Sequence, residues 1–476
     1  MGAQLLVEPG ADVLDRVWAK AREIADVLRS HKEDTVTVVS HIDADGLTAS
    51  AIAVAALDKA GIDYDVDFMK SVRPDLAQGL MDRNPDVAWF SDLGSGASSL
   101  LEKVNKVVTD HHKIDPKGAH DYPHLNCQLF GLDGATAISG SGTTYLAASA
   151  LGGSKEMASV AIVGAVGDLQ DTGSGRLEGL NRVLVDHGRE AGVLDVRTDL
   201  RYFGRETRPV YKMLQYANDP LIPGVSGRED LAHKFLAELG FTPKTADGTW
   251  KSWSMLAREE KREVVSAIAH VLLDKGFGSR HVQRLVGEVY VLPREEPNTE
   301  LRDAKEFATL LNSTARYGHP DIGLAVCLGD RGPALKRARS LLADHRRNLV
   351  EGLQLIADVG ITERDWLQWF HAQGGIRDTI VGIVCGMALG KEGARRDIPL
   401  VGFARTPEGE VKVSARAMRD LVDRGLDLAA AMREAAAHVG GVGGGHRPAA
   451  GATIPVGKED EFLDALELVV QKQLQR

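Results

Sequence analysis

Acidic and imidazole side chains follow four short apolar runs of the sequence. Residues 36–40 are followed by His41-Ile42-Asp43-Ala44-Asp45-Gly46, residues 87–91 by Asp92, residues 106–109 by Asp110-His111-His112, and residues 161–167 by Asp168. Carboxylates and imidazoles bind divalent cations; a carboxylate majority favours Mg²⁺, and an imidazole shifts the preference toward Mn²⁺. The pattern therefore predicts a metal site assembled from distant parts of the chain.

The four apolar runs are interpreted as parallel β-strands of an α/β fold. Buried parallel strands are continuously apolar, and the intervening segments are long enough for crossover helices. Functional groups in such sheets lie just beyond the carboxyl ends of the strands, so a common set of ligands is expected to converge there: Asp43, Asp45, Asp92, His111 and Asp168. One ion does not need so many ligands, which predicts two ions sharing a bridging aspartate. Such a pair serves in-line hydroxide attack on a phosphodiester.

Spacing within these motifs predicts more specific roles. Asp43 and Asp45 are two residues apart, so an extended backbone would direct both side chains to one side. His111 is expected to bind metal, and Asp110 to orient its imidazole, because metal-bound histidines need such a partner. His112 is then available for a phosphate oxygen or a leaving group. Each carboxylate taken alone also fits a helix N-cap, so the hypothesis depends on the whole set.

Two further stretches have the composition of an anion or nucleic-acid site. Residues 138–144 are expected to open a helix with small and hydroxyl side chains, which suits either anion binding or plain capping. Residues 201–211 interleave arginines with aromatic side chains, as a track for a single strand would, and as a partner interface also would.

A glycine-rich run at residues 440–446 predicts a backbone pocket for a phosphate or a nucleotide. It includes Gly443, Gly444 and Gly445, with His446 at its lip, and packing is not expected to require so many glycines. Ser414 and Arg416 end an extended run and offer a hydroxyl and a guanidinium to the same anion. A flexible turn is the alternative interpretation.

A chain of 476 residues predicts two or three domains. We expect a parallel-sheet α/β domain over residues 1–195, a mainly helical accessory region over 196–331, a linker helix over 332–358, and a smaller α/β domain over 359–476 with strands at 379–385, 400–404 and 411–414. The net charge of −10 argues against a uniformly basic nucleic-acid-binding protein but leaves room for a local basic groove.

Cysteine usage and missing motifs argue against several classes of protein. Cys127, Cys327 and Cys385 form no C-x-x-C pair, which predicts reduced thiols in a cytoplasmic protein rather than a zinc or disulfide scaffold. No uncharged apolar stretch is long enough to span a bilayer, so no membrane association is expected. The absence of a Walker A motif and of a strand-anchored G-x-G-x-x-G disfavours ATP hydrolysis and dinucleotide chemistry.

The ordered motifs resemble those of the DHH phosphoesterase superfamily, in particular the archaeal RecJ-like single-strand exonucleases and GINS-associated nucleases. The resemblance rests on residues 41–46, on Ser91-Asp92, on Thr109-Asp110-His111-His112 and on Val166-Gly167-Asp168. Residues 443–451 are also similar to the glycine-rich signature of the DHHA1 domain. Covering nearly the whole chain, the resemblance implies a DHH catalytic domain over residues 1–195 and a DHHA1 substrate-binding domain over 359–476.

The same resemblance implies a role for each matching residue. The ligands of two Mn²⁺ or Mg²⁺ ions would be Asp43, Asp45, Asp92, His111 and Asp168, with Asp92 as the bridge and His41 as an addition. His112 matches a phosphate-contacting histidine, and Arg416 and His446 match positions that bind the nucleic-acid strand. The implied activity is release of mononucleotides from single-stranded DNA or RNA during replication or repair, with the GINS complex or the replicative helicase as a partner.

Two other functions stay open at this point. The first is a small-molecule phosphoesterase that acts on pyrophosphate or on short or cyclic oligonucleotides, although chain length and the accessory region favour polymeric substrates. The second is a replisome scaffold similar to Cdc45, which looks like a degenerate DHH protein. An intact ligand set argues against a purely structural role.

Overall fold

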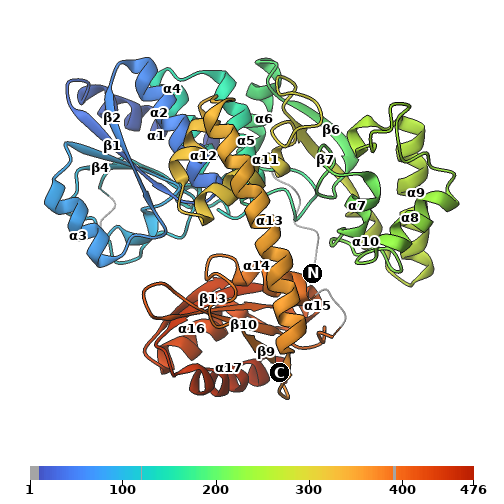
Figure 1. The fold of residues 1–476 in the computed structure, drawn as a ribbon. Coiled ribbons are helices and arrows are strands. Elements are labelled where there is room, and N and C mark those ends of the chain that lie inside the picture. The colour runs from blue at the N-terminus through green and yellow to red at the C-terminus, as the bar shows by residue number, and fades with distance from the viewer. Residues whose placement is uncertain (1–9, 119–120, 390–392, 476) are drawn as a thin grey trace. The chain divides into compact units, whose positions relative to one another are not determined.

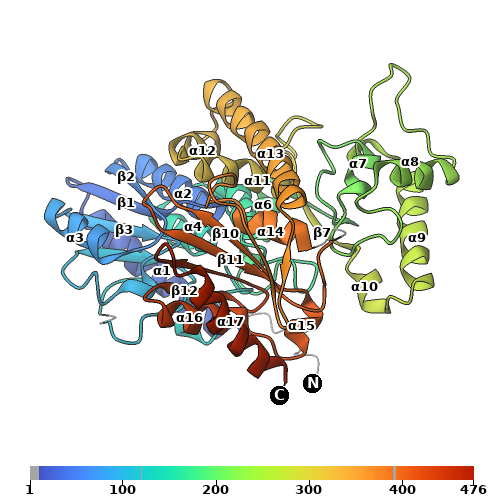
Figure 2. The same cartoon turned by 60° about the horizontal axis from the view of Figure 1, so that its bottom comes forward.

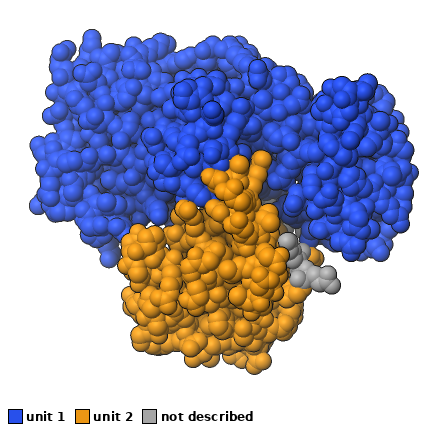
Figure 3. Space-filling view, viewed as in Figure 1, with its two compact units in different colours: residues 1–342 blue, residues 343–476 orange. Residues whose placement is uncertain are grey.

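A long helix, α13 (Pro333–Val359), runs from the first unit of the structure into the second (Figure 1). The computed structural model describes residues 10–118, 121–389 and 393–475. Its two units comprise residues 1–342 and 343–476 (Figure 3). The helix predicted at 332–358 is confirmed, and the sheets and helices of the two units confirm the predicted α/β class.

A five-stranded parallel sheet forms the centre of the first unit, in the order β2-β1-β3-β4-β5. The strands are β1 (Thr35–His41), β2 (Asp63–Met69), β3 (Val87–Ser91), β4 (Lys106–Thr109) and β5 (His124–Leu125). The strands predicted at 36–40, 87–91 and 106–109 are confirmed. The order reverses between β1 and β3, and ligand sites of open parallel sheets form beyond the carboxyl ends of strands at such a switch point.

Helices cover both faces of this sheet and form a separate hydrophobic core on each (Figure 1). The smaller core contains α3 (Pro74–Arg83). The larger core contains α1 (Ala11–Ser30), α2 (Ala44–Ala60), α4 (Gly140–Leu151), α5 (Ala158–Gly167), α6 (Asn181–Glu190), α11 (Ala304–Arg316) and α12 (Pro320–Cys327). Trp89, Leu47 and Phe307 are among the side chains buried in this larger core. Helices α11 and α12 share this core although they fall within the region 196–331.

Residues 161–167 belong to helix α5, so the prediction of a strand there is wrong. The helix is apolar on all sides and packs against α2, α4, α6 and α11. A short, entirely apolar run fits a buried helix as well as a buried strand, because neither exposes a polar face that would reveal its period. Asp168 therefore follows the end of a helix that packs against α2.

A two-stranded antiparallel ribbon carries a helical segment between its strands. The ribbon consists of β6 (Asp195–Leu200) and β7 (Val286–Val291), and the helices are α7 (Val210–Gln215), α8 (Glu229–Glu238), α9 (Arg258–Asp274) and α10 (Ser279–Gln283). These helices enclose a separate core in which Met213, Trp253 and Ile268 are buried. The predicted helical character of this region is confirmed.

The second unit is a six-stranded mixed sheet in the order β12-β13-β11-β10-β9-β8. Its elements are β8 (Thr362–Glu363), β9 (Gln368–His371), α14 (Val381–Leu389), β10 (Leu400–Arg405), β11 (Val411–Arg416), α15 (Arg419–Asp423), α16 (Leu428–His438), β12 (Val442–His446), β13 (Ala449–Ile454) and α17 (Glu459–Leu474). Helices α16 and α17 lie side by side and share a core with Val413 and Ala415 (Figure 2). Helix α14 packs with Leu400 and Ala404 in another core.

The strand predicted at residues 379–385 is wrong, because helix α14 occupies most of that run. Its residues are apolar all round, and Val381, Val384 and Cys385 are buried, so the sequence again shows no helical period. The strands predicted at 400–404 and 411–414 are confirmed as parts of β10 and β11.

The three cysteines, Cys127, Cys327 and Cys385, are free and buried. Burial raises the pKa of the Cys127 thiol to about 11 and those of the other two to about 12. All three therefore stay protonated and unreactive at neutral pH. Separately, no helix among the described residues is both long and apolar enough to cross a bilayer.

Candidate metal centre

Asp43 and Asp45 lie between β1 and α2, but not on an extended backbone. The helix already begins at Ala44, so the prediction that both side chains leave one extended strand on the same side is wrong. Asp43 is the N-cap residue: its Oδ1 accepts the Gly46 N–H at 3.0 Å, while its Oδ2 lies 3.0 Å from Nδ1 of His41. Asp43 can therefore cap the helix through Oδ1 and still face the candidate metal site through Oδ2.

The N-terminus of α4 holds the carboxylate of Asp45. The backbone N–H groups of Gly140 and Ser141 donate to Asp45 Oδ2 and Oδ1 at 2.7 and 3.0 Å, and the Ser139 side chain caps the helix. A helix N-terminus attracts negative charge through its free amides and its dipole. The helix predicted at residues 138–144 is confirmed, and the anion bound at its N-terminus is Asp45.

Asp92 follows β3, and the imidazoles of His41 and His111 lie 3.4 and 3.3 Å from its buried carboxylate. It is 1% exposed, and neither carboxylate oxygen accepts a hydrogen bond from the residues that the structure describes. Its φ of 60° is left-handed, which costs a non-glycine residue about 1–3 kcal/mol. A buried, strained carboxylate of this kind is expected where a cation completes the site.

The ring of His111 is oriented by a backbone carbonyl. Its Nδ1 donates to the Gly134 oxygen at 2.7 Å, which leaves Nε2 to face three carboxylates. Those oxygens are Asp92 Oδ1 at 3.3 Å and Oδ2 of both Asp45 and Asp168 at 3.8 Å. A carbonyl partner on the far nitrogen is the usual support of a metal-bound histidine.

Asp110 orients His112 instead of His111, so that part of the prediction is wrong. Its Oδ1 accepts from the His112 ring Nδ1 at 2.8 Å and from the backbone N–H of His111 and His112, and its Oδ2 accepts the Ser95 N–H. Burial alone would lower the pKa of His112, but the bond to Asp110 raises it to about 9. The half-exposed imidazole is therefore protonated at neutral pH.

Three groups of potential ligands overlap at this edge of the sheet. They are Asp92 with His111 and His112; His41 with Asp43 and Asp92; and Asp45 with His111 and Asp168, and in each group the ligand atoms lie within 4.8 Å of one another. The structure thus brings together all five predicted ligands as well as His41, Asp110 and His112. Asp92 belongs to two groups, as a bridging carboxylate would. The hard oxygen donors, with few imidazoles, fit Mn²⁺ or Mg²⁺.

Without a metal ion, the negative charge of the site is balanced by protons on the imidazoles. Burial alone would lower the pKa of His41, but Asp43 and Asp92 raise it to about 11. Burial opposes protonation of His111 as well, yet Asp92 and Asp168 raise its pKa well above the ordinary value. Both rings are thus cationic at pH 7 in the metal-free protein.

Two carboxyl groups of the site are also shifted toward the protonated form. Burial, followed by the charges of Asp92 and Asp168, raises the pKa of Asp45 well above its usual range. Burial likewise raises the pKa of Asp168 to about 6, although His111 opposes the shift. Protons therefore compete with cations at several positions of the site.

Binding of Mn²⁺ at pH 7 is expected to release protons, and its affinity is expected to rise as the pH increases through 6 and above. A metal-bound imidazole must lose its proton from Nε2, and a protonated Asp168 must lose its own. Isothermal titration calorimetry in two buffers of different ionisation enthalpy measures the released protons. His111→Gln should release fewer. Equal binding enthalpies in both buffers would contradict the assignment of these rings.

Several residues that support the site carry no sequence motif. The Asn312 side chain on α11 accepts the Ala44 N–H at 3.1 Å, and the Gln170 amide donates to Asp168 Oδ2 at 3.0 Å. Arg316, also on α11, interacts electrostatically with Asp43, and burial lowers its pKa. Its guanidinium makes no hydrogen bond or ion pair with the described part of the chain. In the sequence, Arg316 is the single charged residue of the stretch 307–316, and no motif surrounds it.

The residues predicted to bind substrate in the second unit lie on β11 and β12, the two strands that flank β13. Ser414 is in register with Gly451 and Gly444, and Arg416 with Ala449 and His446. Opposite residues of an antiparallel sheet share a face, as do residues two apart. The Arg416 side chain lies against α14, beside Gly382, and within the described residues its only hydrogen bond is to the Ala415 carbonyl.

The glycine run is a strand, β12, instead of a loop, and packing does explain part of it. A Cβ on Gly443 would overlap the Met432 carbonyl of α16, and one on Gly445 would overlap Ala450 of β13. The statement that packing does not require these glycines is therefore wrong for both. Gly444 has open space around the position of its missing side chain, so its backbone is the accessible one.

Domain models and relatives match the chain over both units. The DHH-CID domain matches residues 202–286, and the DHHA1 domain matches residues 368–472. An uncharacterized protein of Methanocaldococcus jannaschii, MJ0831, is 29% identical over 474 residues, which cover 96% of this chain and 99% of the relative.

Solved structures share the fold. RecJ from Thermus thermophilus in complex with Mn²⁺ aligns with 18% identity and a TM-score of 0.58, over 95% of this chain and 55% of the RecJ chain. CDC45 from Entamoeba histolytica aligns with 11% identity and a TM-score of 0.65, over 95% of this chain and 99% of the CDC45 chain. This chain therefore spans about half the length of the Thermus RecJ. The chain thus contains regions that match the DHH-CID and DHHA1 domains, and its fold is similar to those of RecJ and CDC45.

Proposed function

We propose that the chain is a metal-dependent exonuclease that hydrolyses terminal phosphodiester bonds of single-stranded DNA or RNA and releases mononucleotides. The observation that carries the proposal is Asp92, a buried carboxylate with a left-handed backbone and no hydrogen-bond donor among the described residues, shared by two ligand groups. A RecJ with a similar fold was solved in complex with Mn²⁺. Replication or repair, with the GINS complex or the replicative helicase as partner, is the proposed setting.

The metal ligands in this proposal come from four separate stretches of the first unit. They are Asp43, Asp45, Asp92, His111 and Asp168, with His41 in addition. Two Mn²⁺ or Mg²⁺ ions, when bound, supply an activated hydroxide and offset charge on the phosphate. The chain fixes the geometry in advance, because the α4 amides hold Asp45 and the Gly134 carbonyl holds the ring of His111. Such preorganisation avoids reorientation during the reaction.

His112 is proposed to act on the phosphate or on the leaving oxygen. Its Nδ1 donates to Asp110, so the second ring nitrogen carries the proton available to substrate. With a pKa of about 9, the ring is a proton donor at neutral pH, and general acids of this kind contribute about 10²–10⁴-fold. The rate is therefore expected to fall as the pH rises above 9.

Arg316 is proposed to contact a phosphate of the substrate, because a largely buried guanidinium that makes no hydrogen bond or ion pair with the described residues is otherwise unfavourable. Arg316→Met is expected to lower kcat by about 10²-fold while the melting temperature stays the same or rises. Arg83→Met, which removes an exposed pair with Asp67, should leave activity unchanged. A loss of stability that parallels the loss of activity would instead make Arg316 a structural residue.

The second unit is proposed to bind the single-stranded substrate through its phosphates. Arg416 and His446 lie in one register row and Ser414 and Gly444 in another, so a guanidinium, an imidazole, a hydroxyl and an accessible backbone share one face. Phosphate contacts of this kind carry no sequence information and make binding sensitive to salt.

End-labelled substrates test the proposal. The protein is incubated with Mn²⁺ and a long single strand, a duplex, a dinucleotide or pyrophosphate. Release of mononucleotides from the single strand, lost in Asp45→Asn and His111→Gln, supports the exonuclease. Hydrolysis of pyrophosphate or dinucleotides alone would support a small-molecule phosphoesterase.

A scaffold role similar to that of CDC45 is the second candidate, favoured by the fold match over 95% of this chain. It predicts no hydrolysis with any metal together with tight binding to a replication protein. The complete ligand set favours the enzyme, since a scaffold has no need of a buried carboxylate such as Asp92.

A further inference from the structure

The turn that contains Asp168 is strained and is held from two sides. Asp168 caps the end of α5, and the next residue, Leu169, has a φ of 62°. Leu169 is 59% exposed, so its own side chain does not hold this conformation. A non-glycine residue keeps a left-handed backbone only where its surroundings impose it. The neighbours Gln170 and Asp171, both buried, supply that constraint.

Gln170 holds the inner side of the turn. Its Nε2 donates at 3.0 Å to Asp168 Oδ2 and at 3.0 Å to the Gly134 carbonyl, the same oxygen that accepts from His111 Nδ1. The Asn181 amide donates to Gln170 Oε1 at 2.7 Å. The buried amide of Gln170 thus holds the Asp168 carboxylate, and it donates to the same Gly134 carbonyl as the ring of His111.

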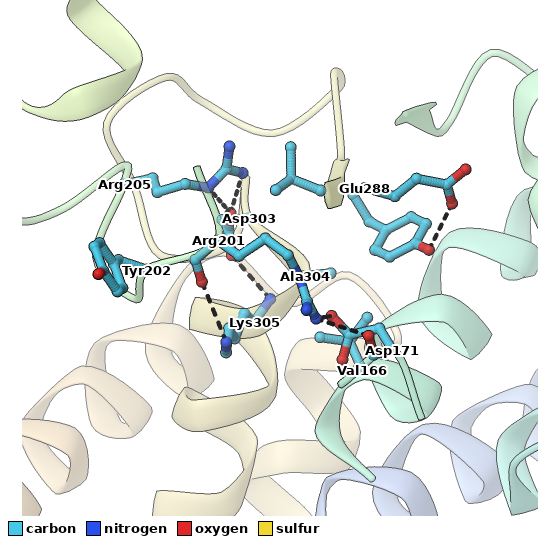
Figure 4. A pocket seen from close by; sticks show the side chains of 11 residues that line it. Val166, Asp171, Arg201, Tyr202, Arg205, Glu288, Asp303, Ala304 and Lys305 are labelled. Atoms are coloured by element: carbon cyan, nitrogen blue, oxygen red, sulfur yellow. Dashed lines mark hydrogen bonds and ion pairs between the residues drawn. The ribbon is translucent and has the colours of Figure 1, made fainter. Parts of the chain in front are cut away.

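Asp171 holds the outer side of the turn through an ion pair with Arg201. One guanidinium nitrogen lies 2.6 Å from Asp171 Oδ2 and 2.8 Å from the Asp171 carbonyl (Figure 4). The two side chains are only 10% and 6% exposed, so water screens the pair weakly. The adjoining cavity of about 20 Å³ holds one water at most and is too small for a substrate.

Arg201 directly follows β6, at the base of the helical segment 202–286. Lys305 donates to its carbonyl at 3.4 Å (Figure 4). The chain beyond the turn also lies on the ribbon: the Glu288 N–H donates to the Gly175 carbonyl at 2.8 Å and the Leu177 N–H to the Tyr290 hydroxyl at 2.6 Å. The loop 168–177 therefore connects the metal centre with the ribbon.

We propose that Arg201 and Asp171 are positioning residues that couple the ribbon β6–β7, and with it the segment 202–286, to the metal ligand Asp168. The inference rests on the proposed function in that Asp168 is taken as a ligand. Loss of one partner leaves a buried charge unpaired, and the strained turn then relaxes away from the site. Because coupling between sites is reciprocal, a change that displaces the ribbon alters metal affinity, and metal binding alters the ribbon.

The basic residues near this junction have a different role from the one that their sequence pattern predicts. That pattern, over residues 201–211, predicts a track for a single strand or a partner interface. Arg201 is committed to Asp171, and Arg205 pairs with Asp303 in the buried junction. Neither guanidinium is available to a nucleic acid, so the track interpretation is wrong for both.

The Mn²⁺ affinity of the full chain, measured by isothermal titration calorimetry, tests the coupling. Arg201→Gln is expected to weaken binding about 10- to 100-fold, and Arg201→Lys by less, because it keeps the charge but not the planar geometry of the guanidinium. Arg197→Gln is the matched control. It removes the exposed 2.6 Å pair with Asp195 on the same strand, β6, and among the described residues Arg197 makes no hydrogen bond or ion pair with the loop 168–177, so wild-type affinity is expected.

Wild-type affinity in a folded Arg201→Gln variant overturns the proposal. Should that variant fail to fold, Gly287→Ala replaces it, because its Cβ overlaps both the Gly175 carbonyl and the Arg201 side chain and so displaces the loop together with the ion pair; unchanged affinity there also overturns the coupling. Failure of the proposed function has a different signature, since the wild-type chain itself would then bind no Mn²⁺ in the same titration.

Discussion

Asp92→Asn is expected to lower kcat by at least about 10³-fold and to abolish the tighter Mn²⁺ binding. The amide keeps the size of the side chain but removes the charge shared by two ligand groups. Metal-held charge stabilisation is worth several kcal/mol, and about 4 kcal/mol corresponds to about 10³ in rate. Steady-state hydrolysis of an end-labelled single strand and a Mn²⁺ titration measure the two effects.

The stability of the metal-free variant separates a functional from a structural role of Asp92. Asparagine removes the ion pairs of Asp92 with His41 and His111 at 3.4 and 3.3 Å. Asp43 still faces the ring of His41, and Asp45 and Asp168 still face that of His111, so the metal-free protein should fold and melt near the wild-type temperature. Asp86→Asn, at the opposite end of the same strand and exposed, is the control and should change neither quantity. Wild-type turnover by Asp92→Asn would contradict the assignment of the bridge.

Gly140→Ala is expected to lower kcat by at least about 10²-fold without removing any ligand. A Cβ at this position overlaps the Asp92 carboxylate, while the Gly140 N–H holds Asp45. The added methyl must displace one of the two side chains, and a displacement of about 1 Å in a catalytic site costs about 10²-fold. Single-turnover rates at saturating Mn²⁺ measure the loss.

A second glycine-to-alanine variant controls for the general effect of the substitution. Gly79 lies inside α3 with open space around the missing side chain, so Gly79→Ala should raise stability slightly and leave the rate unchanged. If Gly140→Ala kept wild-type kcat and Mn²⁺ affinity, activity and metal binding would not depend on the positions that Asp92 and Asp45 have in this structure.

The sheet at the centre of the first unit was predictable because its strands β1, β3 and β4 are short and mainly apolar and are followed by a conspicuous polar residue. The same reasoning failed at α5 and α14, whose residues are apolar on all sides. A completely buried helix shows no polar face, so its period is hidden from a reading of the sequence.

The candidate ligands Asp43, Asp45, Asp92 and His111 were predictable because they lie in short motifs next to strand ends, where a parallel sheet gathers polar groups. Asp168 was predicted from the same pattern although it follows the helix α5. The residues that orient these ligands were not predictable. His111 is oriented by the Gly134 carbonyl, a backbone atom that no side-chain pattern marks. Gln170 and Arg201 support Asp168 through a turn whose strain is visible only in three dimensions.

An anion site at the N-terminus of α4 was predictable, but its occupant was not. Small residues and free amides indicated that a negative charge would lie there. Only the fold shows that Asp45, 95 residues earlier in the chain, supplies it. Sequence patterns thus predicted the type of interaction, and tertiary packing decided its partner.

The most direct measurement is the anomalous difference map of a crystal soaked in Mn²⁺. The account predicts two peaks about 3.5–4 Å apart, bridged by Asp92, with Asp43, Asp45, His111 and Asp168 as the surrounding ligands. A map without a peak within bonding distance of Asp92, or with these side chains turned toward separate regions, would contradict the account.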